Sequence, residues 1–159
     1  MNNYNHLDLD KVKVLVCQYT SIKQAADYIL NEDIIFNPLV IKAKLKDSEE
    51  ALNLLKKDFN LSFDGIVDIG DVLVKASKDI CLDGYELANV LTFSNHCLRI
   101  KNRMSSLNDD LNIKGYSESL FIGEYLIKRI DKVVDINGNI KEDASPKLKS
   151  IFESINRNS

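Results

Sequence analysis

A single helical pattern runs through residues 83–101, which read DGYELANVLTFSNHCLRIK. The segment opens with Asp83 and Glu86 in an Asp-x-x-Glu spacing, a variant of the capping box that satisfies the first free backbone N–H groups of a helix. Behind this start, apolar or small side chains recur at alternating steps of three and four residues: Leu87, Val90, Leu91, Ser94, Cys97 and Leu98. That period places them on one face, so the sequence predicts a long amphipathic helix here.

The same period recurs on both sides of this segment and predicts further helices. Upstream, two short helices are expected within residues 8–30. Asn37 and Pro38 have the pattern of a cap and a first-turn proline, which open a long helix that runs to about residue 59. Its predicted buried face comprises Ile41, Leu45, Leu52, Leu55 and Phe59. Downstream, a shorter helix is expected around 72–76 and a longer one over 120–134, so the fold class is mainly α, as a multi-helix bundle.

The pattern changes between residues 134 and 141. Apolar and polar side chains alternate there around Asn137 and Gly138, the dipeptide best suited to the two positive-φ positions of a type I′ turn. The sequence therefore predicts one small β-hairpin near 134–141. Ser145 and Pro146 then form a cap and first-turn pair for a final helix, whose apolar face comprises Leu148, Ile151, Phe152 and Ile155. Because no glycine follows them, we expect these residues to be the start of a longer helix.

Composition limits the classes of protein to consider. The chain has 159 residues, 45% hydrophobic and 28% charged, which is typical of one globular domain with one core. The longest uncharged stretch, Leu87 to Leu98, is far shorter than the roughly 20 apolar residues that cross a bilayer, so no membrane partner is expected. The net charge of -3 argues against a dedicated nucleic-acid-binding domain. Three cysteines, an odd number, favour free thiols in a reducing cytoplasm, so the expected localisation is cytoplasmic.

No motif predicts a catalytic, cofactor or metal site. Gly65 and Gly70 have the glycine spacing of a phosphate-binding loop, but Asp71 stands where that loop requires lysine, and an acid repels the nucleotide. His96 and Cys97 are adjacent, which on a helix turns them about 100° apart, so they do not form a nucleophile–base pair. The cysteines also lack the Cys-x-x-Cys spacing of zinc sites. The residues alone therefore indicate an all-helical binding or scaffold module.

A second stretch, Ile130 to Leu148, reads IDKVVDINGNIKEDASPKL. It resembles a segment of the MutS proteins of the second type (MutS-II), in which an Ile-Asp-x-x-Gly-x-Ile/Val hairpin leads through Asp-x-Ala-Ser-Pro-x-Leu into a very long helix. The residues that match in register are Val134, Asp135, Gly138, Ile140, Ala144, Ser145, Pro146 and Leu148. Weaker agreement extends upstream to Leu9, so the resemblance covers nearly the whole chain.

The resemblance implies that this chain is the N-terminal helical core and lever region of such a protein. Residues 1–143 would be the core domain with the hairpin, and residues 144–159 the first turns of the lever or clamp helix. The clamp, the ATPase that binds ATP and Mg²⁺, and the Smr nuclease domain would all be absent from this chain. The parent would be a cytoplasmic homodimer that binds branched DNA and restrains recombination, or that splits collided ribosomes.

For these residues, the resemblance implies a non-catalytic scaffold that lies beside the ATPase and carries its nucleotide state to the clamp. Contacts to a polyanion would lie on the final helix, at Lys147, Lys149 and Arg157. Phe152 departs from the family pattern, because an arginine often follows Ile151 there. Two alternatives remain: a free-standing helical interaction or dimerisation module, and a small thiol-dependent enzyme.

Overall fold

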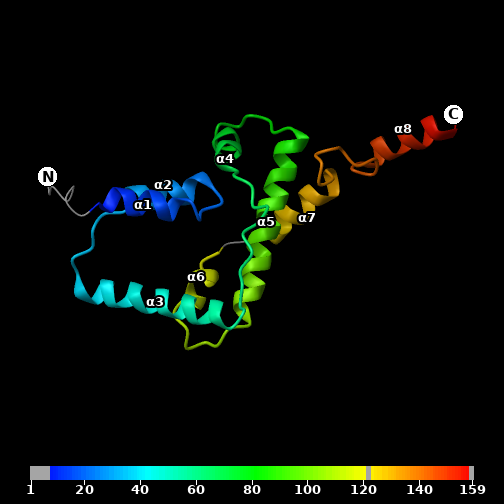
Figure 1. The fold of residues 1–159 in the computed structure, drawn as a ribbon. Helices are drawn as coiled ribbons and strands as arrows, with labels where there is room; N and C mark the ends of the chain where they lie inside the picture. The colour runs from blue at the N-terminus through cyan, green and yellow to red at the C-terminus, as the bar shows by residue number, and fades with distance from the viewer. Residues whose placement is uncertain (1–7, 121–122, 158–159) are drawn as a thin grey trace. The chain divides into compact units, whose positions relative to one another are not determined.

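The computed structural model describes residues 8–120 and 123–157, and within these ranges the chain forms eight α-helices and no β-strand (Figure 1). The helices are α1 (Leu9–Cys17), α2 (Lys23–Asn31), α3 (Pro38–Lys56), α4 (Gly70–Ser77), α5 (Gly84–Ser105), α6 (Lys114–Glu118), α7 (Glu124–Val133) and α8 (Pro146–Arg157). The prediction of a mainly α-helical chain is confirmed, although the sequence pattern did not predict α6. No helix in the described part of the chain is long and apolar enough to cross a membrane.

The predicted starts of the two longest helices are confirmed. The Asn37 side chain accepts a hydrogen bond from the backbone N–H of Leu39 at 2.9 Å, and Pro38 is the first residue of α3. At the start of α5, the backbone N–H of Glu86 donates to Asp83 at 2.8 Å, and the backbone N–H of Asp83 donates back to Glu86 at 3.0 Å. This is the reciprocal geometry of a capping box, and it fixes where α5 begins.

The chain divides into two compact units, in contrast to the single core that its length predicts. One unit contains the described residues of Met1–Ile66 and Ile100–Leu120, and the other those of Val67–Arg99 and Phe121–Ser159. The division falls within α5, after Arg99. The functional division expected at residue 143 stays a prediction.

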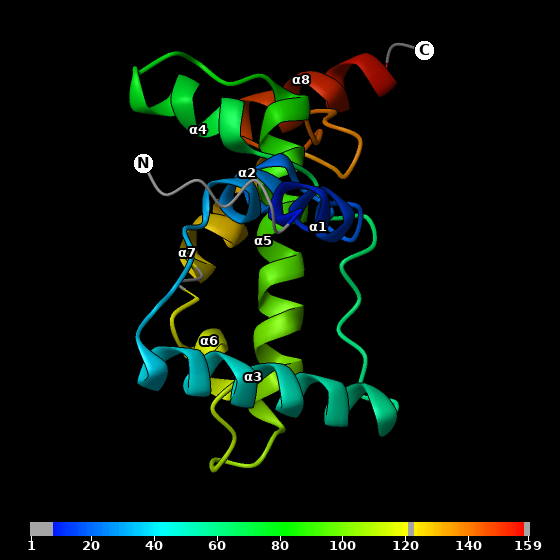
Figure 2. The ribbon, with the colours of Figure 1, turned by 60° about the vertical axis from the view of Figure 1, so that its left-hand side comes forward.

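In the first unit, α1 and α2 lie side by side, as Figure 2 shows. The Lys13 ammonium donates to the backbone carbonyls of Leu30 at 2.9 Å and Glu32 at 2.6 Å, which ties α1 to the end of α2. The Cys17 thiol donates to the carbonyl of Ala26 at 3.6 Å. Polar contacts to the backbone therefore hold this helix pair at both ends.

Helix α3 contacts the residues around α6 through its polar side. Glu50 is only 8% exposed, and its carboxylate accepts the backbone N–H of Ile113 at 3.0 Å, just before α6. Lys46 forms an ion pair with the same carboxylate at 3.6 Å. The Tyr116 hydroxyl donates to Asp47 at 2.6 Å, and this hydrogen bond raises the pKa of Tyr116. These contacts fix α6 against α3.

The buried face predicted for α3 is therefore wrong. Four of its five residues are exposed: Ile41 by 39%, Leu45 by 66%, Leu52 by 51% and Leu55 by 58%. Phe59, which lies just after α3, is half-buried beneath the Arg103 guanidinium, whose carbon is 4.6 Å from the ring centroid. The reason is that the polar face of α3, with Glu50, makes the contacts within this unit.

The second unit has a small apolar core between α5 and α7. Leu91 from α5 and Ile130 from α7 pack with Val134, whose side chain is fully buried. Partly buried residues surround this cluster: Leu87, Val90 and Ile127. An ion pair between Lys75 and Glu86 joins α4 to the first turn of α5.

The β-hairpin predicted near 134–141 is wrong. One antiparallel bridge, between Val134 and Ile140, is the whole of the β-pairing in the described segments, and no strand forms. The turn closes earlier than predicted, with the Gly138 N–H donating to the Asp135 carbonyl at 3.1 Å. Gly138 has a φ of 83°, but Asn137 is not among the described residues with positive φ. A type I′ turn needs positive φ at both of its central residues, here Asn137 and Gly138. Because only Gly138 meets this condition, the turn is not type I′ and a regular two-stranded hairpin does not continue from it.

Candidate functional site

Asp135 organises the turn that follows α7. Its carboxylate accepts the backbone N–H groups of Asn137 and Asn139, both at 2.8 Å, and the Asn139 side-chain amide at 3.0 Å. These hydrogen bonds, first that of the Asn139 side chain, lower the pKa of Asp135. Three donors on one carboxylate fix the path of the backbone from Asp135 to Asn139. The contacts of Asp135 are therefore those of a residue that stabilises the turn.

A close backbone contact joins this turn to the first residue of α5. A Cβ atom added to Gly84 would lie 2.1 Å from the carbonyl oxygen of Gly138. A Cβ atom added to Gly138 would lie 2.7 Å from the backbone N and Cα of Tyr85. Both positions therefore require glycine. The sequence singled out Gly138 as a turn residue but gave no sign that Gly84 would meet it.

A cleft of about 500 Å³ lies between α5, α7 and this turn. It is lined by Leu91, Thr92, Asn95, His96, Arg99, Asp131, Asp135, Ile136 and Lys141. The Arg99 guanidinium is 2.7 Å from Nδ1 of His96, which accepts because a guanidinium can only donate. Lys141 donates to Asp131, 3.2 Å from its carboxylate. Because two basic side chains and two carboxylates line this cleft, their formal charges balance and offer no excess positive charge to attract a polyanion.

The motif residues at 144–146 connect the turn to α8. The Ala144 N–H donates to the Lys141 carbonyl at 3.0 Å. The Ser145 hydroxyl accepts the backbone N–H of Leu148 at 3.2 Å, and Pro146 is the first residue of α8. The predicted cap and first-turn proline of the final helix are thus confirmed.

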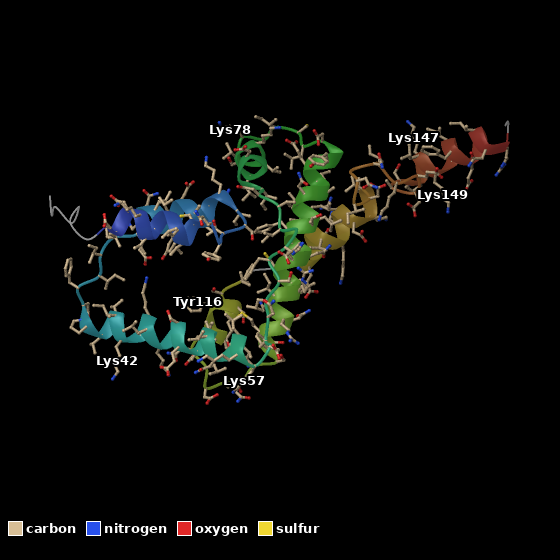
Figure 3. The ribbon with its side chains drawn as sticks, viewed as in Figure 1. Lys42, Lys57, Lys78, Tyr116, Lys147 and Lys149 are labelled. Atoms are coloured by element: carbon tan, nitrogen blue, oxygen red, sulfur yellow. The ribbon has the colours of Figure 1, made fainter. Side chains whose placement is uncertain are left out.

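The three basic residues expected to contact a polyanion lie on α8 but do not converge. Lys147 and Lys149 are exposed, and Figure 3 shows their side chains on opposite sides of the helix. A separation of two residues turns side chains about 200° apart on a helix, which explains this arrangement. Arg157 is 3.9 Å from Glu153 in an exposed ion pair. The other lysines labelled in Figure 3 lie on α3 or in the loops after α3 and α4.

The glycines at 65 and 70 differ in structure: Gly65 lies in a turn, and Gly70 is the first residue of α4. Gly65 has a φ of 73° in the link after α3. The backbone N–H of Gly70, at the start of α4, donates to the Asp68 carboxylate at 2.8 Å. In a phosphate-binding loop, a backbone N–H at this position would point toward the bound phosphate. Here the Gly70 N–H is bound instead by a carboxylate of the protein itself.

The three cysteines are free thiols, and burial raises the pKa of the Cys97 thiol, which disfavours its nucleophilic thiolate. Among the described residues, no group of three or more His, Cys, Asp or Glu side chains is arranged to hold a metal ion.

Comparison with known proteins supports a relationship to MutS2 proteins over nearly the whole chain. The chain is 25% identical over 152 residues to the Endonuclease MutS2 of Clostridium perfringens, and 26% identical over 155 residues to that of Clostridium botulinum strain Alaska E43. It is 28% identical over 145 residues to the Endonuclease MutS2 of Thermotoga neapolitana. These alignments cover 94%, 94% and 91% of this chain.

No protein-family model and no solved structure matches the chain. The chain spans about a fifth of the length of the curated relatives, because each alignment covers 19% of the relative. Nearly all of this chain is therefore similar to one limited segment of proteins named Endonuclease MutS2.

Proposed function

We propose that this chain is a non-catalytic helical scaffold segment of a MutS2-like protein, equivalent to the N-terminal core and the start of the lever helix. One observation carries the proposal: the alignments cover 91 to 95% of this chain but 19 to 20% of each relative. The name endonuclease describes the whole relatives. The catalytic domains, including the ATPase that binds ATP and Mg²⁺, belong to the other four fifths in this proposal.

The geometry of the second unit supports a coupling role for the segment. The Gly84–Gly138 contact leaves no space between the start of α5 and the turn, so a displacement of one is passed to the other. Asp135 holds that turn, and the Ala144–Lys141 hydrogen bond continues the connection to α8. In the proposed function, α5 senses the nucleotide state of a neighbouring ATPase domain. The turn then transmits this state to α8 and onward to a clamp on branched DNA or on a collided ribosome.

The basic residues of α8 are proposed to contact the polyanion only in the assembled protein. Lys147 and Lys149 lie on opposite sides of α8 and Arg157 is paired with Glu153, so α8 alone offers few simultaneous phosphate contacts. Because affinity for nucleic acid depends on the number of phosphates neutralised together, further basic groups must come from the rest of the protein. A homodimer would double the number available.

A segment-replacement experiment tests the proposal. Residues 1–159 replace the aligned segment of the Clostridium perfringens relative, and cleavage of branched DNA is measured beside a deletion of the segment. A graft that also carries Val134→Asp is the matched control, because it places a charge in the fully buried core position. We expect the graft to retain cleavage, and the deletion and the Val134→Asp graft to lose it. A graft that is soluble but as inactive as the deletion would contradict the proposal.

A further inference from the structure

An exposed apolar stripe runs along α3. It comprises Ile41, Leu45, Ser48, Leu52 and Leu55, and we name it the α3 seam. Its residues are separated by steps of four, three, four and three, the spacing of the a and d positions in a coiled coil. Its four apolar side chains are 39 to 66% exposed, while the opposite side of α3 makes the contacts of this unit. Within the described residues of the first unit, the α3 seam is thus a packing face without a partner.

We propose that the α3 seam pairs with the α3 seam of a second copy of this chain, as a short parallel coiled coil. In heptad terms Leu45 and Leu52 occupy a positions, and Ile41, Ser48 and Leu55 occupy d positions. The proposal concerns the isolated chain and does not depend on the proposed function.

The charges beside the seam favour a second copy in the parallel direction. Lys44 occupies a g position, and Glu49 occupies the e position of the next heptad. In a parallel pair, a g residue faces the e residue of the following heptad on the partner helix, so Lys44 faces Glu49 of the second copy. Two-fold symmetry produces this attraction twice. Lys44 also pairs with Glu32 of its own chain, but its ammonium has three donors and can contact both carboxylates.

The antiparallel registers of the same seam differ in their charge contacts. In an antiparallel pair a positions pack against d positions and e positions face e positions, so Leu45 packs against Leu55 or against Ser48 of the second copy. The first register brings Lys42 opposite Lys56 twice and Glu49 opposite Glu49, and like charges across an interface reduce affinity. The second register brings Lys42 opposite Glu49 twice, but it leaves only two layers of the seam without Ser48, against four in the parallel pair.

Ser48 sets a limit on the strength of the pairing. It lies in the middle of the seam, where its hydroxyl already donates to the Lys44 carbonyl at 3.0 Å. The hydroxyl therefore remains satisfied when buried, but it contributes little apolar area. The seam spans less than the 19 residues of α3, so the interface falls in the weak class, below about 1,200 Å². We expect a dimer of this weak class to form at roughly tens to hundreds of micromolar.

Sedimentation equilibrium of the full chain, from about 10 µM to about 1 mM, tests the proposal over the range of weak dimers. We expect the mass to rise toward that of a dimer, and Leu52→Glu to keep the chain monomeric. Leu126→Glu is the matched control, because Leu126 on α7 is 52% exposed, against 51% for Leu52, and lies off the seam. Ser48→Leu should tighten the dimer by at least about tenfold, since it adds a buried leucine to each helix.

Charge variants test the direction of the pairing. Lys44→Glu and Glu49→Lys should each weaken the dimer, and an equimolar mixture of the two variants should restore it, because both cross-chain contacts are then attractive. Circular dichroism verifies that every variant keeps its helical content. A chain that stays monomeric even with Ser48→Leu would overturn the proposal, as would a dimer that Leu52→Glu leaves intact. Charge variants without effect on a seam-dependent dimer would overturn its parallel direction.

Discussion

Gly84→Ala tests the contact between α5 and the 134–141 turn, because the substitution has two opposed effects. Alanine favours a helix over glycine by about 0.8–1.0 kcal/mol in a helix interior, and by less in a first turn. The added Cβ, however, would lie 2.1 Å from the carbonyl oxygen of Gly138, a backbone atom that cannot rotate away. Forcing extra atoms into a packed site costs about 1–3 kcal/mol. We therefore expect a net destabilisation of about 1–2 kcal/mol.

Gly115→Ala provides the matched control. Gly115 lies in α6, and a Cβ added there would meet nothing within 4 Å, so alanine should leave stability unchanged or raise it slightly. Urea unfolding followed by circular dichroism measures both variants, and hydrogen exchange of the Gly138 and Asn139 amides reports on the turn itself. Faster exchange is expected in Gly84→Ala alone. If Gly84→Ala were as stable as the original chain, with unchanged exchange in the turn, the close contact would not exist in solution.

Three further predictions concern other parts of the chain. Glu50→Ala should destabilise the first unit by about 1–3 kcal/mol, because it leaves a backbone N–H before α6 without its acceptor, and Glu50→Gln should recover part of this loss in urea unfolding. The pKa of Asp135 is lowered by hydrogen bonds led by that of Asn139. Its contribution to stability is therefore present above the ordinary aspartate range and is lost as pH falls through the lowered value. The turn amides should thus lose protection, relative to their intrinsic exchange rates, only below the ordinary aspartate range, and Asp135→Asn should remove this dependence. Fluorescence anisotropy with a four-way junction should show weak binding that moderate salt abolishes, because the net charge is -3, and any residual affinity should fall with Lys147→Glu and Lys149→Glu; submicromolar binding at physiological salt that survives both changes would place the site elsewhere.

Local signals in the sequence were sufficient to place the helix starts. The capping pair at Asp83 and Glu86 and the Asn37 cap each involve residues two or three positions apart, so their hydrogen bonds depend on nothing distant. The same holds for the Ser145 hydroxyl at the start of α8. Each of these contacts depends only on the local backbone conformation, so it can be predicted from a single sequence.

The turn at 134–141 shows why a local signal can also mislead. Asn137 and Gly138 have the residue types of a type I′ hairpin, but the Asp135 carboxylate bonds the backbone N–H groups that follow it. A side chain that accepts nearby backbone donors offers the chain an alternative to a ladder. The contact of Gly138 with Gly84 joins residues more than fifty positions apart, so no local pattern could indicate it.

The α3 helix marks the limit of arguments from periodicity. A period of 3.6 identifies which side chains share a face, but it does not say which part of the molecule covers that face. On α3, the apolar stripe that the pattern assigned to the core is exposed, and the buried side is held by Glu50, whose carboxylate contacts the backbone N–H of Ile113. A charged residue is rarely buried unless it is paired and hydrogen-bonded, and here Lys46 and that N–H meet both conditions. The polar contacts therefore fix the orientation of α3, and this orientation leaves the apolar stripe available for a second helix.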